Sequence, residues 1–185
     1  MVIKNLTKAV TRVKKAVKNK EKIILYGDSD LDGVTSVIIL KEALATLGGE
    51  VSAIYFPDRE GEGYGVTFTA LEKLKELAPA LLIVMDMGIS SFKEIEKANE
   101  LGFEIILLDH HEVLGELPKA SIIVDPKQPE ETYGFKGFAA CGVTFKFAEK
   151  LLGNPSQATR QSMLELAAIG TIADMMLTAE PNIKW

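Results

Sequence analysis

Short apolar runs alternate with amphipathic stretches along much of this chain. Five runs have the length and composition of buried strands, at residues 22–26, 51–56, 80–85, 104–108 and 121–124. Three stretches between them have helical periodicity, at residues 34–47, 66–77 and 91–101. Near-continuous apolar strands that alternate with amphipathic helices are typical of a parallel sheet covered on both faces. The pattern therefore predicts a doubly wound α/β domain with a mainly parallel, five-stranded sheet.

The chain is expected to be helical before the first strand and after the last. Residues 1–20 place their apolar side chains on one helical face, and we expect this helix to pack on the domain. Two more helices are expected, at about 138–152 and from about 156 towards 172, because Gly153 and the Asn-Pro pair after it form a stop signal between them. We interpret residues 21–185 as one domain with a helical C-terminal segment.

The composition indicates a single domain without a membrane segment. At 185 residues and 47% hydrophobic content, the chain is long enough for one good core and hardly long enough for two. Its apolar runs fall far short of the ~20 residues that cross a bilayer, so we expect no membrane contact and a cytoplasmic location. The one cysteine, Cys141, excludes an internal disulfide and a thiolate metal cluster, and we expect it to be a small buried residue.

Charge is distributed unevenly along the chain. The first 22 residues carry eight Lys or Arg and one Glu, whereas the remainder carries 13 basic and 25 acidic residues. The basic arm has two interpretations: contact with a nucleic-acid backbone, or a solvated helix face, which we prefer. An acidic body that handles a phosphate substrate needs bound cations.

Metal-ligand residue types follow three of the expected strands. Asp28, Asp30 and Asp32 follow the first apolar run, Asp86 ends the third, and the only two histidines follow the fourth, in Asp109-His110-His111. Ligands of such sheets bind beyond the carboxyl ends of the strands. Carboxylates ~4 Å apart repel by roughly 4 kcal/mol per pair at an effective dielectric near 20, so a cluster this dense favours bound cations. We expect the first three aspartates to share one face of an extended segment, with Gly33 letting the chain turn into the next helix.

Each of these motifs also has an ordinary structural interpretation. An Asp-x-Asp pair commonly caps a helix or binds Ca²⁺ in a loop, and Asp86 could cap the helix expected near Ser90. Two histidines could be a core or surface pair, but neighbours on an extended segment face opposite ways, so at most one would be buried. The combination favours metal binding.

The donor atoms of these residues indicate which metal ion is bound and which reaction it supports. Oxygen and nitrogen donors without sulfur favour Mn²⁺ or Mg²⁺ over Zn²⁺. Two such cations ~3.5–4 Å apart would lower the pKa of a bridging water and clamp the attacking and leaving oxygens of a phosphorus centre. Both histidines belong to this constellation, and neither a nucleophile elbow nor a Walker or dinucleotide sequence is present. Hydrolysis of a phosphoester by a metal-activated water is the expected chemistry.

Four ordered motifs resemble the DHH phosphoesterase superfamily: Gly27 to Ser36, Asp86 with Gly88, Asp109 to His111, and Gly170 to Asp174. The likeness covers roughly residues 21–176. Further stretches are similar to the RecJ branch of single-strand exonucleases: Pro57 to Gly65, Leu117-Pro118 with 124–129, and Cys141 to Lys146.

The resemblance implies roles for individual residues. It implies two ions, Mn²⁺ or Mg²⁺, held by Asp30, Asp32, Asp86, His110 and Asp174, with Asp86 as the bridge. It further implies that Asp109 orients a histidine, that His111 faces the scissile phosphate, and that Arg59 and Tyr64 lie near the substrate path. Many superfamily members carry a histidine ligand where this chain has Tyr26, so either Asp28 compensates or one metal is bound weakly.

The resemblance also implies an activity, with two alternatives. The expected activity is 5′–3′ exonucleolytic removal of nucleotides from single-stranded DNA, with bases stacking on residues such as Tyr64. We expect the family's second, substrate-binding domain to be absent from this chain, and the residues after Asp174 depart from the branch. A second domain or a partner chain is therefore expected to close the cleft. The alternatives are a phosphatase or phosphodiesterase of short oligonucleotides or small nucleotides, and a catalytically weak scaffold completed by a partner chain.

Overall fold

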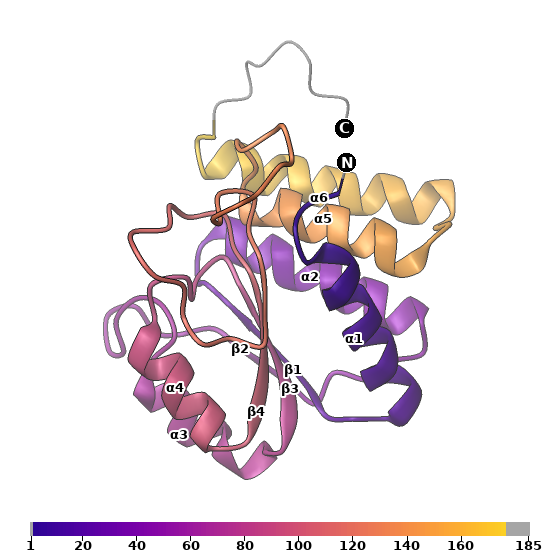
Figure 1. The fold of residues 1–185 in the computed structure, drawn as a ribbon. Coiled ribbons are helices and arrows are strands. Elements are labelled where there is room, and N and C mark those ends of the chain that lie inside the picture. Colours follow the sequence, from indigo (N-terminus) through magenta and orange to yellow (C-terminus); the bar gives the residue numbers. More distant parts are fainter. Residues whose placement is uncertain (1, 177–185) are drawn as a thin grey trace.

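The computed structural model describes residues 2–176 (Figure 1). Its helices are α1 (Leu6–Asn19), α2 (Leu31–Thr46), α3 (Phe68–Leu74), the short 3-10 helix η1 (Lys75–Leu77), α4 (Phe92–Glu100), α5 (Ala140–Leu152) and α6 (Gln157–Ala173). Its strands are β1 (Ile23–Gly27), β2 (Ala53–Tyr55), β3 (Ala80–Met85), β4 (Phe103–Leu108) and β5 (Ile122–Val124). The predicted order of strands and helices is confirmed, with element ends displaced by a few residues.

The five strands form one parallel sheet in the order β2-β1-β3-β4-β5. The predicted parallel, five-stranded, doubly wound sheet is therefore confirmed. The chain moves from β1 outward to β2 and then crosses to β3 on the other side of β1. This reversal leaves a crevice beyond the carboxyl ends of β1 and β3, which is where open α/β sheets bind ligands.

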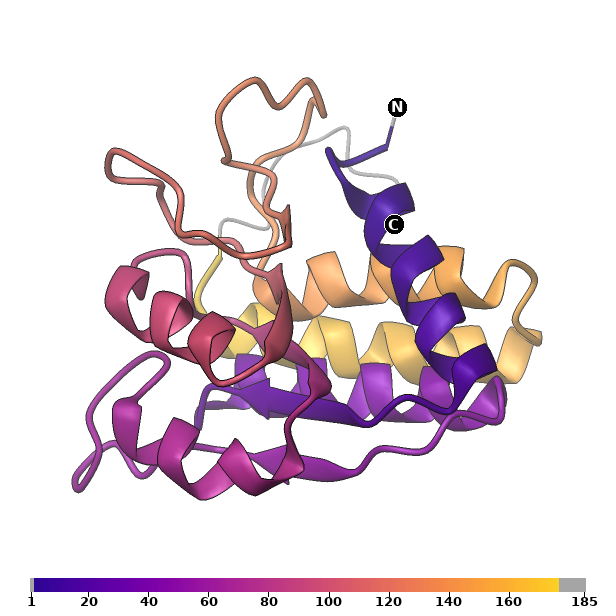
Figure 2. The same ribbon diagram turned by 60° about the horizontal axis from the view of Figure 1, so that its bottom comes forward.

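Helices cover both faces of the sheet (Figures 1 and 2). Helices α1, α2, α5 and α6 share one apolar core with the sheet, and α3 and α4 share the other. Alternate residues of a strand feed the two cores: Ile83 packs into the first and Leu82 into the second. Helix α2 lies between the sheet and the α5/α6 pair, so it is buried around most of its circumference and carries few charged residues.

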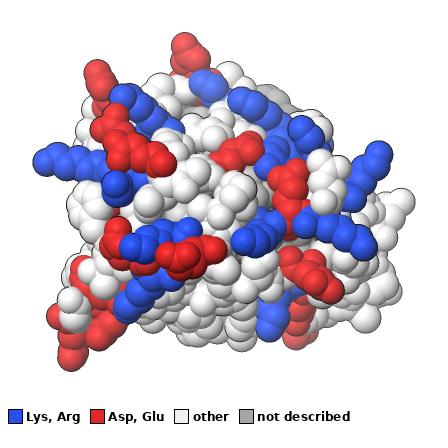
Figure 3. Space-filling model, turned by 90° about the horizontal axis from the view of Figure 1, so that it is seen from below, with Lys and Arg blue, Asp and Glu red and all other residues white. Residues whose placement is uncertain are grey.

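Helix α1 packs against α5 and β5 through an apolar face that includes Val10 and Val13. Arg12 adds polar contacts, because its guanidinium bridges Glu104 of β4 at 2.7 Å and Glu21 at 2.6 Å. On the face seen from below in Figure 1, basic and acidic side chains are interspersed (Figure 3). Among the described residues, no helix is long and apolar enough to span a membrane.

The start of α2 differs from the prediction. The helix begins at Leu31 rather than near residue 34, because the side chain of Asp30 caps it by accepting a hydrogen bond from Gly33 N–H at 3.0 Å. Asp32 therefore lies in the first helical turn, and the predicted extended segment with three aspartates on one face is wrong. The predicted turn role of Gly33 is also wrong: a Cβ there would lie 2.3 Å from the carbonyl oxygen of Asp28, so glycine is needed for close backbone approach.

Candidate metal centre

Six of the predicted ligands meet at the carboxyl edge of the sheet. Together with His111 they form three overlapping groups of three residues, and within each group the ligand atoms lie within 4.8 Å of one another: Asp86, His110 and His111; Asp32, His110 and Asp174; and Asp28, Asp30 and Asp86. Asp86 and His110 each belong to two groups, which joins the three into one centre. The residues come from the ends of β1, β3 and β4, from the start of α2 and from the end of α6. Their convergence requires the sheet order described above.

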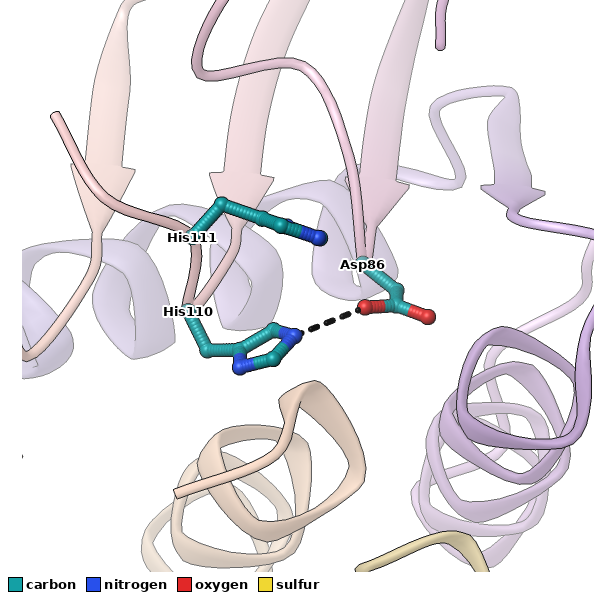
Figure 4. A group of neighbouring side chains, drawn as sticks. All are labelled: Asp86, His110 and His111. Carbon is teal, nitrogen blue, oxygen red and sulfur yellow. Dashed lines mark ion pairs between the residues drawn. The ribbon is translucent and has the colours of Figure 1, made fainter. Parts of the chain in front are cut away.

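His110 lies in the middle of this centre. Its Nε2 atom is 3.2 Å from Asp86 Oδ1 (Figure 4). The same atom is 3.7 Å from Asp174 Oδ2 and 3.8 Å from Asp32 Oδ2. The side chain is buried, and neither ring nitrogen makes a hydrogen bond within the described residues. Burial, followed by the neighbouring charge of His111, lowers the pKa of His110. A neutral imidazole that is buried among carboxylates is suited to binding a cation.

Asp86 follows β3 in a left-handed backbone conformation, with φ of 65°. Its N–H donates to the carbonyl of Leu108 at 3.0 Å, which ties it to the end of β4. The carboxylate is 3% exposed; burial, and then the charges of Asp32 and Asp30, raise its pKa. A bound cation would remove this repulsion, so the donor set and its electrostatics fit a divalent metal.

Asp32 is held by the start of α5. Its two carboxylate oxygens accept hydrogen bonds from the N–H groups of Ala140 and Cys141, both at 2.7 Å. The N–H groups at a helix start are free to bind an anion, so α5 fixes this carboxylate in place. Sequence reasoning missed these two residues. The only available signal was the likeness of the segment Cys141 to Lys146 to the RecJ branch, which carried no role.

Asp109 belongs to none of the three ligand groups, and it holds the segment that follows β4. Its carboxylate accepts hydrogen bonds from Ile89 N–H at 3.0 Å, His110 N–H at 2.8 Å and His111 N–H at 3.2 Å, and contacts His111 Nδ1 at 2.8 Å. Burial alone would raise the pKa of Asp109, but these hydrogen bonds bring it below its ordinary value. The contact with Asp109 raises the pKa of His111, whose side chain is half exposed. These are the contacts that an orienting carboxylate requires.

Arg59 contacts two carboxylates of the centre directly, although it was expected only near the substrate path. Its guanidinium is 2.8 Å from Asp28 Oδ2 and 2.8 Å from Asp30 Oδ2. Its Cζ atom is also 5.1 Å from the ring centroid of Tyr64, which is 75% exposed. The arginine therefore links the acidic centre to an exposed aromatic ring.

A cavity of about 680 Å³ lies beside the centre. Asp28, Asp86 and His111 line it on the side of the metal-ligand groups, and Tyr64 and the 84% exposed Leu114 line it elsewhere. The predicted substrate-binding residues Tyr64 and His111 thus border one cavity that adjoins the carboxylates.

The side chain of Tyr26 lies in the apolar core that α3 and α4 share with the sheet. It is completely buried in the core under α3, its hydroxyl donates to Gly65 C=O at 3.1 Å, and Thr67 N–H donates to the hydroxyl at 3.2 Å. The tyrosine thereby holds the backbone next to Tyr64. Asp28 lies at the carboxyl edge of the sheet, in the group with Asp30 and Asp86.

Comparison with known proteins identifies relatives over nearly the whole chain. Residues 22–171 match the family described as "DHH family, N-terminal domain". The chain is 44% identical over 180 residues to the single-stranded-DNA-specific exonuclease RecJ of Bacillus subtilis. This alignment covers 97% of this chain and 22% of that protein. It is 32% identical over 174 residues to the RecJ of Thermus thermophilus, covering 94% of this chain and 25% of that protein. The chain thus spans about a quarter of the length of these relatives.

Solved structures show the same fold. A crystal structure of exonuclease RecJ bound to manganese superposes with a TM-score of 0.82 at 32% identity, covering 95% of this chain and 44% of that one. RecJ from Thermus thermophilus in complex with Mn²⁺ superposes with a TM-score of 0.75 at 29% identity, covering 94% of this chain and 24% of that one.

Proposed function

The chain belongs to the DHH family, and we propose that it is the catalytic part of a RecJ-like exonuclease that hydrolyses phosphodiester bonds of single-stranded DNA. Mn²⁺ or Mg²⁺ is the proposed cofactor, and the cytoplasm is the proposed setting. The relatives named as RecJ exonucleases and the manganese-bound RecJ structures support the reaction class. One observation carries the proposal: three ligand groups join through Asp86 and His110 beside a cavity.

The metal-binding roles follow from how each side chain is held. Asp32, fixed by two N–H groups, and His110, neutral and without a hydrogen bond within the described residues, would hold one cation together with Asp174. Asp86 is shared between this side and the Asp28–Asp30 side, so it would be the bridge between two cations. When bound, two such cations lower the pKa of a water molecule and neutralise charge on the phosphate.

The proposed role of His111 is to meet the scissile phosphate. Its Nδ1 is taken by Asp109, so Nε2 is the ring nitrogen that remains for a ligand, and the side chain lines the cavity. The raised pKa keeps a proton on this ring more readily than on an ordinary histidine, and a protonated imidazole donates a charge-assisted hydrogen bond to a phosphate oxygen. Asp109 would act through His111 by holding its orientation.

The proposed substrate path runs from the carboxylates past Tyr64. An exposed aromatic ring binds any unpaired base by stacking, which suits a single strand of arbitrary sequence. Arg59 lies between this ring and the acidic centre, where its planar guanidinium suits a backbone phosphate. We further propose that a second domain or a partner chain closes the cavity, because its rim exposes the large apolar side chains of Tyr64 and Leu114.

The test is cleavage of a labelled single strand, a duplex and a dinucleotide, each with Mn²⁺ and with EDTA. We expect the single strand to be shortened only with Mn²⁺, and His110→Ala and Asp86→Asn to lose this activity. Glu100→Gln is the control, because Glu100 lies at the exposed end of α4, outside the three ligand groups. Preferential cleavage of the dinucleotide would instead favour a small-substrate phosphodiesterase, and no cleavage of any substrate at high Mn²⁺ would contradict the catalytic proposal.

A further inference from the structure

The two sides of the candidate centre differ in their counter-charges. On one side, Arg59 forms ion pairs with both Asp28 and Asp30 through Nη2, and its Nε donates a hydrogen bond to Asp28 at 3.1 Å. On the other side, within residues 2–176, no lysine or arginine forms an ion pair with Asp32, Asp86 or Asp174. The Asp28–Asp30 side is thus paired with a positively charged side chain, whereas the side with Asp32, Asp86 and Asp174 is not paired with a lysine or arginine within the described residues.

We propose that Arg59 competes with a divalent cation for Asp28 and Asp30, and so weakens cation binding on this side of the centre relative to the His110 side. The inference rests on the proposed function, because it concerns the same metal centre. The carboxylates of Asp28 and Asp30, which would bind the cation, both accept hydrogen bonds from the guanidinium. A positive charge held at this distance also repels a second cation.

The loop that carries Arg59 is anchored without it. Before Arg59, the hydroxyl of Ser29 donates a hydrogen bond to the carbonyl oxygen of Pro57. After it, the buried carboxylate of Glu62 accepts a hydrogen bond from the hydroxyl of Tyr55 at 2.7 Å. Displacement of the guanidinium therefore requires a side-chain movement and no rearrangement of the loop.

A displaced guanidinium has a second position close at hand. Arg59 already lies over the ring of Tyr64, and that ring lines the cavity together with His111. Cation–π contact stabilises an arginine at such a position, and its fork of N–H donors suits a phosphate that enters the cavity. The movement that opens the carboxylates therefore leaves Arg59 on the proposed substrate path.

Calorimetric titration of MnCl₂ into the full chain tests this competition. For the unaltered protein we expect a tighter event at the His110 side and a weaker event at the Arg59 side. Arg59→Ala should tighten the weaker event by about tenfold or more, equivalent to about 1.4 kcal/mol, and leave the tighter event unchanged. Asp30→Asn should remove the weaker event in both backgrounds. Arg59→Gln, which keeps a shorter polar side chain without charge, provides the same comparison if Arg59→Ala does not fold.

Arg12→Ala is the matched control. Arg12 also bridges two carboxylates, Glu21 and Glu104, but lies at α1, outside the three ligand groups, so its loss changes the net charge equally and should leave Mn²⁺ binding unchanged. If Arg59→Ala binds Mn²⁺ as the unaltered protein does, or if Arg12→Ala tightens binding as much, the competition is wrong and the metal centre stands. If none of the three proteins binds Mn²⁺, the metal centre and the proposed function are both wrong.

Discussion

The carboxylate of Asp109 lies 2.8 Å from Nδ1 of His111, and it is completely buried although the histidine is half exposed. A buried acceptor fixes the ring more firmly than a solvent-exposed one, because it has few alternative positions. The same carboxylate accepts three backbone N–H groups, including that of Ile89 near the end of β3. Asp109 thus connects the ends of two strands and orients the proposed phosphate-binding side chain with one group.

Asp109→Asn should lower both activity and stability. The asparagine presents an N–H₂ group where a carboxylate oxygen now accepts a hydrogen bond, so one or more buried donors lose their partner, at a cost of about 1–3 kcal/mol. Loss of the contact with His111 should reduce the Mn²⁺-dependent cleavage rate by roughly 10–100-fold. Thermal unfolding and single-strand cleavage measure the two effects.

The double variant with His111→Ala shows whether Asp109 acts through the histidine. If it does, adding Asp109→Asn to His111→Ala should cost little further activity. Two losses that multiply in full would mean that Asp109 affects catalysis by another route.

Asp86→Asn should separate metal binding from folding. Asparagine tolerates the left-handed backbone of this residue and removes the repulsion with Asp30 and Asp32, so in EDTA the variant should unfold at the same temperature as the unaltered protein or higher. For the unaltered protein, Mn²⁺ at 100 times its dissociation constant should add about 2.7 kcal/mol of stability, and the variant should lose most of this gain. Melting curves with EDTA and with Mn²⁺ provide both values.

Asp86→Ala is the informative companion. It should lose the same Mn²⁺-dependent gain but also unfold at a lower temperature in EDTA, because alanine in the left-handed region costs about 1–2 kcal/mol. Retention of the full Mn²⁺ effect by both variants would show that Asp86 is not a ligand.

The sheet and most candidate ligands could be predicted from the sequence because both are local features. Each strand is a short apolar run, and Asp86 and Asp109 directly follow such runs, so their place at the carboxyl edge follows from parallel pairing. The start of α2 was misplaced because capping by Asp30 competes with the extended conformation that alternating aspartates suggest.

The contacts that hold the ligands could not be predicted in this way. Asp32 is fixed by Cys141, which is 109 residues away in the chain. Arg59 reaches Asp28 from the loop that follows β2. Such pairs depend on how helices and loops pack on the sheet, and no periodicity or motif spacing in a single sequence predicts them. The need for glycine at position 170 likewise depends on contacts with residues far away in the chain.

Gly170→Ala should weaken metal binding through helix packing. A Cβ at this position would lie 2.5 Å from Thr35 Oγ1, 2.7 Å from Cys141 Sγ and 3.2 Å from Asp32 Oδ1. Helix α6 must then move away from α2 and α5, at a cost of about 1–3 kcal/mol. Because Asp174 lies at the end of α6, its carboxylate moves with the helix, and Mn²⁺ affinity should fall.

Gly134→Ala is the matched control for this substitution, since a Cβ at Gly134 meets no atom within 4 Å. Calorimetric Mn²⁺ binding and melting temperature should both remain unchanged in the control. Unchanged Mn²⁺ affinity in Gly170→Ala would show that the centre does not depend on the close packing of α6.

Tyr26→Phe should affect the substrate more than the metal. The change removes the hydroxyl that accepts from Thr67 N–H and donates to Gly65 C=O, and so loosens the loop that carries Tyr64. We expect stability to fall by about 1–3 kcal/mol, since buried backbone groups lose their partner. KM for a single strand should rise more than kcat falls, with Mn²⁺ affinity unchanged. A loss of Mn²⁺ binding would instead place Tyr26 in the metal centre.

Asp125, which follows β5, should make stability depend on pH. The side chain is completely buried, and its Oδ2 has no hydrogen-bond partner within the described residues. Burial raises its pKa to about 7; the backbone N–H of Lys127 opposes this shift, the charge of Asp109 adds to it, and the charges of Lys127 and His111 oppose it.

The raised pKa determines the sign of the pH effect. Between about pH 4 and pH 7 the unfolded chain releases the Asp125 proton and the folded chain retains it, so this residue's contribution to stability falls as pH rises and is lost above pH 7. Asp125→Asn, which cannot ionise, should therefore raise stability relative to the unaltered protein by about 1–3 kcal/mol more at pH 8 than at pH 4.5. For a domain of this size, each kcal/mol corresponds to about 2–4 °C in Tm. Asp58→Asn, which alters an exposed carboxylate, is the control for the loss of one negative charge. An equal shift at both pH values for Asp125→Asn would mean that the buried carboxylate is not the group that titrates.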